Sequence, residues 1–422
     1  MPRVRGFQIL AMATIFALMV SSRSVQGADQ TEDGEGPVDW PALISRLQQR
    51  VYDHPGLAQA RHQLATAYNN YGVQLGQEGQ WNLAVRQFQE AIRLADDDQQ
   101  FKRNLANVRM NQAYDAYQRH QIPEALQALD QTVTLDPELV QAYVLRGQIE
   151  YDRQQLKEAK AAWERAVALD PSQTELAQRL KQVTQELPVE SKFERLSQSY
   201  FDLRYEEQVE RPVGFDIRDA LYEARRTVGS DFAYWPDRKF VVLIYSAESF
   251  RALRQEVPDW VGGQFDGKIR VPLPSAQLDQ AIVRQVLFHE YTHALVHDLA
   301  KDACPTWLNE GLAEYEGRTQ APGDLTLLAG ARDAGQLIPW LQLSEHITGG
   351  ESAQAVGLAY EQSYSIIAYL AAQHGFWRFR RLLKTIGEGT PWLAAMEQEY
   401  HLKLTRLEGR WQAWLPEWLK SR

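Results

Sequence analysis

A helical pattern that repeats along residues 41–187 restricts the fold of this chain more than any other feature. Three segments align with one another: "WNLAVRQFQEAIRLADD", "IPEALQALDQTVTLDPE" and "LKEAKAAWERAVALDPS". Equivalent positions hold similar residues, namely Ala84, Ala125 and Ala159, then Phe88, Leu129 and Trp163, then Ala91, Thr132 and Ala166. Small side chains let paired helices approach, and the larger ones fill the groove between them. The pattern predicts an all-α solenoid of stacked helix pairs.

The third unit holds the fullest set of characteristic residues, which are Tyr143, Gly147, Tyr151, Ala159, Trp163, Ala166 and Pro171. With these residues the array resembles the tetratricopeptide repeat, in units of about 65–98, 106–139 and 140–173. The second and third units are 34 residues apart, and the first and second are 41 apart. The seven extra residues, about two helical turns, should lengthen a helix. The resemblance implies a concave surface for a peptide or protein partner, and a spacer that packs on the next domain is the alternative.

The N-terminus reads "MPRVRGFQILAMATIFALMVSSRSVQGADQ". Arg3 and Arg5 precede an apolar run over residues 9–20, and small and polar residues follow, which is typical of a secretory signal peptide over residues 1–27. We therefore expect an exported protein, periplasmic or secreted, in a bacterial envelope. The apolar run is shorter than the ~20 residues of a membrane-spanning helix, so a membrane is a partner only if the signal segment stays uncleaved. Residues 28–40 are acidic and predict a disordered lead-in.

Charge and cysteine content limit the functions that remain. The 422 residues have a net charge of -10, and no basic patch stands out, so the sequence gives no support to nucleic acid as a partner. Cys304 is the single cysteine, which excludes an intramolecular disulfide. An exported protein of this kind must be held together by its core, which its length permits.

The repeat pattern stops around residues 186–192, and a different composition follows. The segments "YFDLRYE", "KFVVLIYS" and "GKIRVPL" predict strands, with glycine or proline near their ends. From about Gln277 the chain is expected to be helical to its end. Strands followed by helices predict an α+β domain with a small sheet.

The segment "FHEYTHALVHD" places three histidines on one predicted helix, over residues 280–300. His289 and His293 are one turn apart, so both rings project to the same side of an otherwise apolar stripe. This arrangement suits two ring nitrogens that bind one zinc ion. Glu290, within the pattern His-Glu-x-x-His, can reach a metal-bound water without coordinating the metal. His297 is not on this stripe, and we interpret it as a core histidine or one that supports a ligand.

A hydrolytic zinc site needs a third protein ligand. The pattern that would supply a third histidine from the same helix is absent, because Leu299 stands at that position and Val296 replaces its glycine. The segment "PTWLNEGLAEYEG" offers Glu310 and Glu314, one turn apart on a second short helix. One carboxylate could complete the site, and the other could orient a histidine from outside the coordination sphere.

These motifs together resemble the gluzincin metallopeptidases, in which His-Glu-x-x-His is followed by Asn-Glu-Gly. The resemblance implies Zn²⁺ bound by His289, His293 and Glu310, with Glu314 as an alternative ligand, and Glu290 as the catalytic base. The stretch "AYEQSYSIIAYL" is similar to one in which these enzymes carry a catalytic tyrosine ahead of a helix, which maps to Tyr360. The family's Lys-Gly after this tyrosine is here Gln362-Ser363.

Over residues 195–418 the chain is similar to the smaller peptidase-MA-like domains of bacteria. The resemblance implies hydrolysis of a peptide or protein substrate, and endopeptidase action is expected because no Gly-Ala-Met-Glu-Asn-type segment is evident. Residues 262–273 are the expected edge strand for an extended substrate. The alternative function is a non-catalytic adaptor, in which the repeats bind a partner and the zinc domain only binds peptides.

Overall fold

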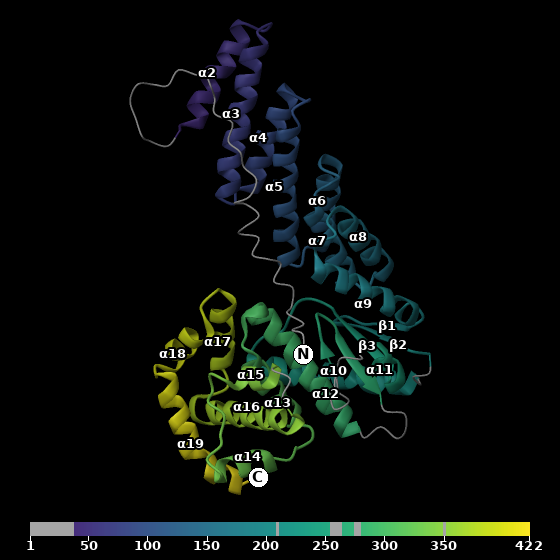
Figure 1. Cartoon of the computed structure of the whole chain (residues 1–422), viewed down its shortest axis with the longest axis vertical. Coiled ribbons are helices and arrows are strands. Elements are labelled where there is room, and N and C mark those ends of the chain that lie inside the picture. The colour runs from purple at the N-terminus through teal and green to yellow at the C-terminus, as the bar shows by residue number, and fades with distance from the viewer. Residues whose placement is uncertain (1–37, 208–210, 254–263, 274–279, 349–351) are drawn as a thin grey trace. The chain divides into compact units, whose positions relative to one another are not determined.

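The computed structural model describes residues 38–207, 211–253, 264–273, 280–348 and 352–422. The expected signal peptide lies outside these residues, and the lead-in is described only from Val38 onward. The chain divides into two compact units, of which one ends at Thr184 and the other runs from Gln185 to Arg422 (Figure 1). Among the helices described, none combines the length and the apolar character that a membrane-spanning segment needs.

The first unit is helical, as the sequence predicts. Its helices are α2 (Trp40–Asp53), α3 (Ala58–Gln77), α4 (Trp81–Leu94), α5 (Gln99–Gln118), α6 (Ile122–Leu135), α7 (Val140–Asp152), α8 (Leu156–Leu169) and α9 (Thr174–Glu190), the last of which continues into the second unit. Short connections join consecutive helices, which pack as neighbours along the unit. Helix α5 has 20 residues and α7 has 13, so the seven extra residues do lengthen a helix.

The equivalent positions of the repeat pattern are all buried. The three alanines and the three large residues aligned with them are at most 1% exposed, and so are Ala91, Thr132 and Ala166. Two glycines explain how closely the paired helices approach. A Cβ atom on Gly72 would lie 3.0 Å from the Phe88 ring, and one on Gly147 would lie 2.2 Å from the Trp163 ring. Each pair has the same sequence separation, so two helix pairs use the same contact.

Within its described residues, the second unit contains a five-stranded mixed sheet in the order β1-β2-β3-β5-β4. Its strands are β1 (Glu194–Ser197), β2 (Phe201–Tyr205), β3 (Phe240–Ser246), β4 (Gln264–Phe265) and β5 (Ile269–Leu273). The three central strands are parallel, with Leu203 opposite Val242 and Val242 opposite Ile269, and both outer strands are antiparallel to their neighbours. The three strands expected from the sequence are therefore confirmed as β2, β3 and β5.

Two details differ from the sequence expectation. A long helix, α10 (Arg211–Phe232), lies between β2 and β3 and makes the crossover that two parallel strands require. The expected edge segment, residues 262–273, also holds two strands rather than one: the two-residue β4 forms the edge of the described sheet, and β5 lies inside it. Residues 262 and 263 of that expected strand lie outside the described residues.

Helices follow the sheet to the end of the chain. They are α11 (Ala247–Leu253), which lies between β3 and β4, and then α12 (Gln280–Ala300), the short 3-10 helix η1 (Lys301–Ala303), α13 (Thr306–Gly317), α14 (Thr326–Asp333), α15 (Leu343–Thr348), α16 (Ala353–His374), α17 (Arg378–Gly387), α18 (Trp392–Tyr400) and α19 (Leu404–Lys420).

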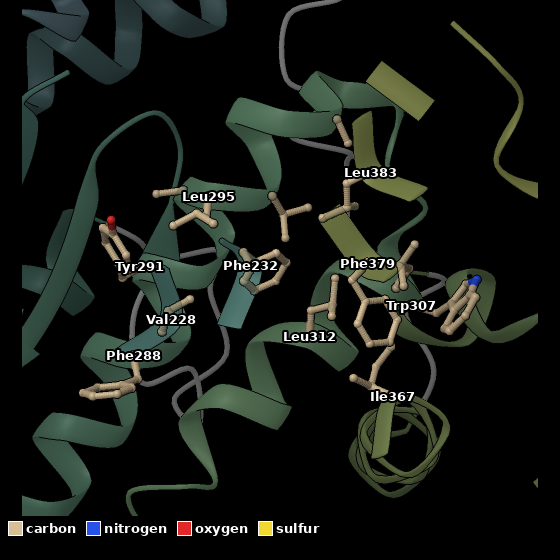
Figure 2. Packing of buried hydrophobic residues seen from close by; sticks show 14 of the residues in the cluster. Val228, Phe232, Phe288, Tyr291, Leu295, Trp307, Leu312, Ile367, Phe379 and Leu383 are labelled. Atoms are coloured by element: carbon tan, nitrogen blue, oxygen red, sulfur yellow. The ribbon is translucent and has the colours of Figure 1, made fainter. Parts of the chain in front are cut away.

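One large apolar cluster joins the sheet to these helices. It takes Val242 and Val271 from one face of the sheet, and residues such as Phe232, Leu295 and Phe379 from α10, α12 and α17 (Figure 2). The other face of the sheet contributes Val241, Leu243 and Tyr245 to a smaller cluster with Phe250 of α11. The larger cluster fixes α12 and α13 (Figure 2), the two helices that carry the predicted zinc ligands.

Candidate metal centre

Helix α12 presents the two histidines of the His-Glu-x-x-His pattern on one side. It is buried from Leu287 to Val296 except for a partly exposed His289. Apolar side chains such as Leu287 and Leu295 are fully enclosed in the core, so the helix cannot rotate without exposing them. This packing holds the imidazoles of His289 and His293 against the following helix.

Helix α13 brings Glu310 to these histidines because two of its glycines permit close packing on both sides. A Cβ on Gly317 would lie 3.1 Å from the carbonyl oxygen of Gln285 and 3.4 Å from the Cβ of His289, on α12. A Cβ on Gly311 would lie 2.8 Å from the carbonyl oxygen of Ser363, on α16. Helix α13 therefore fits tightly between α12 and α16, with Glu310 next to the closest contact.

Three ligand atoms converge where α12 meets α13. The Nε2 atoms of His289 and His293 are 3.0 Å apart, and the Glu310 Oε2 atom is 3.6 Å from the first and 3.5 Å from the second. Zinc ligands in a tetrahedral arrangement, at about 2.0–2.1 Å from the metal, are about 3.3 Å from one another. The three atoms thus already have the spacing of one face of a tetrahedral site.

The opposite nitrogen of each imidazole has an oxygen acceptor. His293 Nδ1 lies 3.0 Å from Asn309 Oδ1, and His289 Nδ1 lies 3.4 Å from Glu314 Oε1. In the neutral tautomer that a metal requires, each Nδ1 carries the proton, and the lone pairs of the two Nε2 atoms face one another and the Glu310 carboxylate. The two lone pairs and the carboxylate oxygen repel one another unless a cation lies between them. The residues therefore fit a divalent metal, and zinc in particular.

Glu314 is itself held by Arg318, one turn further along α13. The Nε atom of Arg318 donates to Glu314 Oε2 at 2.7 Å, and its guanidinium lies over the Tyr364 ring at 4.8 Å. The Arg318 side chain is largely buried and also donates to the carbonyl of Asp324. Both oxygens of Glu314 therefore have partners, and its place behind His289 suits it to orient that imidazole.

The pKa values of the ligand residues also indicate a site that favours positive charge beside the Glu310 carboxylate. Burial lowers the pKa of His289, but its hydrogen bonds with Glu310 and Glu314 outweigh burial and hold the pKa well above its ordinary value. Burial raises the pKa of Glu310, yet attraction to His293 and hydrogen bonds from both histidines hold the pKa below its usual range. Glu310 is therefore ionised at any physiological pH, as a metal ligand must be.

Glu290 lies beside the three ligands with one oxygen unused. Its side chain is buried, and its Oε2 atom has no hydrogen-bond partner among the residues that the structure describes. Burial raises the pKa of Glu290, and attraction to His293 and His289 opposes this only in part. A buried carboxylate with a free oxygen and a raised pKa has the properties of a general base.

Tyr360 also reaches the site, but not in the way expected. It lies inside α16 rather than ahead of a helix. Its hydroxyl is hydrogen-bonded to Glu310, and burial raises its pKa, so the group stays protonated and can donate. The departures that follow it are structural, since the Gln362 amide pairs with the backbone N–H and carbonyl of Ile338, and Ser363 is the residue against which Gly311 packs.

His297 and Cys304 are near the site but are not among the three converging ligands. His297 is neither in the core nor beside the ligands, because its side chain is 45% exposed and contacts Asp302 and the ring of Phe265. Cys304 is partly buried, and burial together with the charge of Glu310 raises the pKa of its thiol.

Sequence reasoning missed Asn309 and Arg318. Asn309 directly precedes Glu310, and Arg318 follows Glu314 by four residues, the separation at which an acid and a base meet on a helix. Both could have been found from these positions.

The ligand side chains are not fully enclosed. The side chains of His289, His293 and Glu310 remain 20%, 10% and 17% exposed, although the apolar core surrounds the helices that carry them. Solvent therefore reaches part of each of these side chains. The fold and the site together define a metallopeptidase-like domain. It consists of a small mixed sheet, the His-Glu-x-x-His helix that shares an apolar core with the sheet, and a glutamate from the next helix.

Comparison with known proteins agrees with this class. Residues 242–417 match the family model of the Peptidase MA superfamily, which identifies a peptidase-MA-like domain in the second unit. The match begins in β3 and includes α12, α13 and α16, so it contains all the site residues discussed above. A search of curated proteins found no match to the chain.

Proposed function

We propose that this protein is a zinc-dependent endopeptidase that is exported and that recruits its substrate or a partner protein through a tetratricopeptide-like array. The convergence of His289 Nε2, His293 Nε2 and Glu310 Oε2 at 3.0–3.6 Å is the observation that carries the proposal. Three protein ligands with room for one more are typical of catalytic rather than structural zinc.

Zinc held by these residues would supply an activated water and polarise the scissile carbonyl. Glu290 takes a proton from the attacking water on its free Oε2 oxygen and passes it to the leaving amine. The Tyr360 hydroxyl stays protonated and, once it turns from Glu310 to the substrate, can donate a hydrogen bond to the developing oxyanion. Asn309 and Glu314 keep the two imidazoles in the tautomer that leaves Nε2 free for the metal.

The antiparallel edge of the sheet supports a peptide as the substrate. Within the described sheet, strand β4 pairs with β5 on one side only. The ring of Phe265, on β4, lies against His297 of α12. An extended peptide could add to this edge and continue past the metal ligands. Nothing in this arrangement requires a free amino terminus, which favours cleavage within a chain.

The recruitment role rests on the helical unit. Its repeated contacts, Gly72 with Phe88 and Gly147 with Trp163, support an array of equivalent helix pairs. Such arrays present extended surfaces to other proteins. The export role rests on residues 1–27 alone.

The test uses the chain from Ala28 and its Glu290→Gln variant, each incubated with a diverse peptide mixture. New peptide termini are identified by mass spectrometry. We expect internal cuts by the first protein and at least a 100-fold loss in the second, since general acid–base catalysis contributes that much. Absence of cleavage by either protein, with zinc bound to both, would favour the non-catalytic adaptor instead.

A further inference from the structure

The helical unit contains a cavity that has no part in the metal centre. Its volume is about 680 Å³, and it lies among the start of α4, the second half of α5 and the first half of α6. This volume is within the range of pockets that bind small ligands or peptide side chains. The lining combines apolar side chains, Trp81, Leu83, Ala116 and Ala128, with amides and charged side chains, among them Arg109.

One helix pair departs from the repeat at residues that line the cavity. The alignment that superimposes Ala84 on Ala125 also superimposes Tyr68, Tyr71 and Leu75 of the first unit on Arg109, Gln112 and Ala116 of the second. Tyr68 and Leu75 are buried, and Tyr68 lies against α2, where the Gln48 amide donates to its hydroxyl. In the second unit the three equivalent residues, Arg109, Gln112 and Ala116, line the cavity instead.

Arg109 has no acidic partner among the residues that the structure describes. It is half-buried on α5, and its Nη1 atom donates to the Gln112 amide oxygen at 2.9 Å. Burial lowers the pKa of its guanidinium, which reflects the cost of holding the charge there. A partly buried cation without a counter-charge is a place where an anionic group gains more than it would at the surface.

The other charges of the lining do not compensate Arg109. Asp115 accepts hydrogen bonds from Arg119 at 2.9 Å and from the Trp81 indole at 3.2 Å, so its charge is already matched. Glu124 stands in the first turn of α6 and is exposed, where solvent screens it. The Gln112 amide donates to Asn82 at 2.9 Å and forms part of the wall between α4 and α5.

We propose that this cavity binds an acidic peptide, with an aspartate or glutamate side chain on Arg109 and a neighbouring apolar side chain against Trp81 and Leu83. The guanidinium can pair with a carboxylate through two hydrogen bonds, and the Gln127 and Gln131 amides of the lining suit a peptide backbone. The inference deepens the proposed partner role of the repeats and does not depend on peptidase activity.

The experiment uses the chain from Ala28 with Glu290→Gln, stripped of zinc with phenanthroline and dialysed. The probe is a pair of synthetic hexapeptide libraries, acetylated and amidated, with a central Asp or Glu in one and a central Asn or Gln in the other. Peptides captured by the immobilised protein are counted by mass spectrometry. We expect carboxylate peptides to be enriched about tenfold over their amide counterparts.

Two variants and one control locate the effect. Arg109→Gln should abolish the enrichment, whereas Arg103→Gln, which removes an exposed charge from the same helix, should leave it unchanged. Ala116→Leu restores the residue found in the first unit and should reduce capture of both libraries by filling the cavity. Circular dichroism confirms that each variant keeps its helical content.

The inference is overturned if neither library is retained, if both are retained equally, or if the enrichment persists in Arg109→Gln. Removal of zinc and the Glu290→Gln change exclude capture and cleavage at the metal centre. A failure here therefore leaves the peptidase proposal intact, and inactivity of the metal centre leaves this one intact.

Discussion

Two imidazole nitrogens that face each other across 3.0 Å, each with its opposite nitrogen committed to an oxygen, define the chemistry of the candidate site. Neither histidine can turn its ring without losing Asn309 or Glu314. The side chains behind the ligands thus determine which atoms the metal meets. Arg318 belongs to this group, although it is not itself a ligand and acts through Glu314.

Replacing Arg318 by glutamine should weaken zinc binding about tenfold, because Glu314 would lose the donor that fixes its position behind His289. Competition with a chromogenic chelator measures the zinc affinity directly. Arg332→Gln is the matched control, since Arg332 pairs with its exposed neighbour Asp333 away from the ligands. Equal losses in both variants, or none in either, would contradict a positioning role for Arg318.

Glu316 should make the stability of the second unit depend on pH. Its carboxyl is fully buried, neither oxygen has a hydrogen-bond partner in the described part of the chain, and burial raises its pKa from 4.5 to about 8. The folded protein therefore holds a proton that the unfolded chain releases above pH 4.5. This contribution to the free energy of unfolding is complete below about pH 4.5 and is lost as pH rises through about 8.

Denaturant unfolding of the wild type and of Glu316→Gln between pH 5 and 8 measures this contribution. The wild type should lose on the order of a few kcal/mol relative to the variant over that range. The difference between the two proteins cancels the titration of the metal ligands. A constant difference across the range would mean that Glu316 is ionised in the folded state.

The ligand set was more accessible to sequence reasoning than its surroundings. Helical spacing places His289 and His293 together, and Glu310 followed from a resemblance. The position of Tyr360 within its helix and the solvent exposure of His297 were not predictable, because both depend on where other helices end. Contacts such as Arg318 with Tyr364 join residues 46 positions apart, and no local pattern encodes them.

At the scale of elements, the position of the metal centre depends on how closely α13 approaches its neighbours. Gly311→Ala would bring a methyl group to 2.8 Å from the Ser363 carbonyl oxygen and 2.9 Å from Ile367. The backbone oxygen cannot move aside as a flexible side chain can, so α13 would have to shift. Glu310 would shift with it.

We expect Gly311→Ala to lower the free energy of unfolding by about 1–3 kcal/mol and to weaken zinc binding. Gly330→Ala is the matched control, because a Cβ at that position in α14 meets nothing within 4 Å and alanine favours the helix by up to about 1 kcal/mol. Chemical denaturation and chelator competition on both variants separate the two cases. A stable Gly311→Ala protein with unchanged zinc affinity would show that α13 is not constrained by α16.

The elements that sequence analysis missed have two physical explanations. Helix α10 was hidden because the expectation grouped all strands before the helices, whereas two parallel strands need a crossover between them. Strands β1 and β4 have four and two residues, too short for an alternating pattern to stand out. The long apolar strand β3 and the periodic helices, in contrast, were found from the sequence.

At the scale of the whole molecule, a buried charge network sets where the second unit begins. Arg270 on β5 is fully buried and pairs with Glu190 at 2.7 Å, Glu186 at 3.2 Å and Asp266 at 3.1 Å. Two of these acids belong to the last turns of α9. The unit therefore extends upstream of residue 195, where the sequence resemblance begins.

A chain of residues 185–422 should fold and bind zinc, whereas one of residues 195–422 should be less stable by about 3–5 kcal/mol. The shorter chain leaves Arg270 buried without Glu186 and Glu190, and removal of one side of a buried ion pair costs about this much. Thermal unfolding followed by circular dichroism compares the two. Equal melting temperatures would mean that the network is not required for folding.

The metal ligands come from two helices, and a bound ion would join them as a reversible cross-link. Its contribution to folding is then set by supply: at a free zinc concentration 100 times the Kd it amounts to about 2.7 kcal/mol, and it vanishes as zinc is withdrawn. Where zinc is scarce, α12 and α13 separate more readily and other proteases gain access to the chain. The lifetime of the protein would therefore follow the zinc content of its surroundings, independently of any peptide it cleaves.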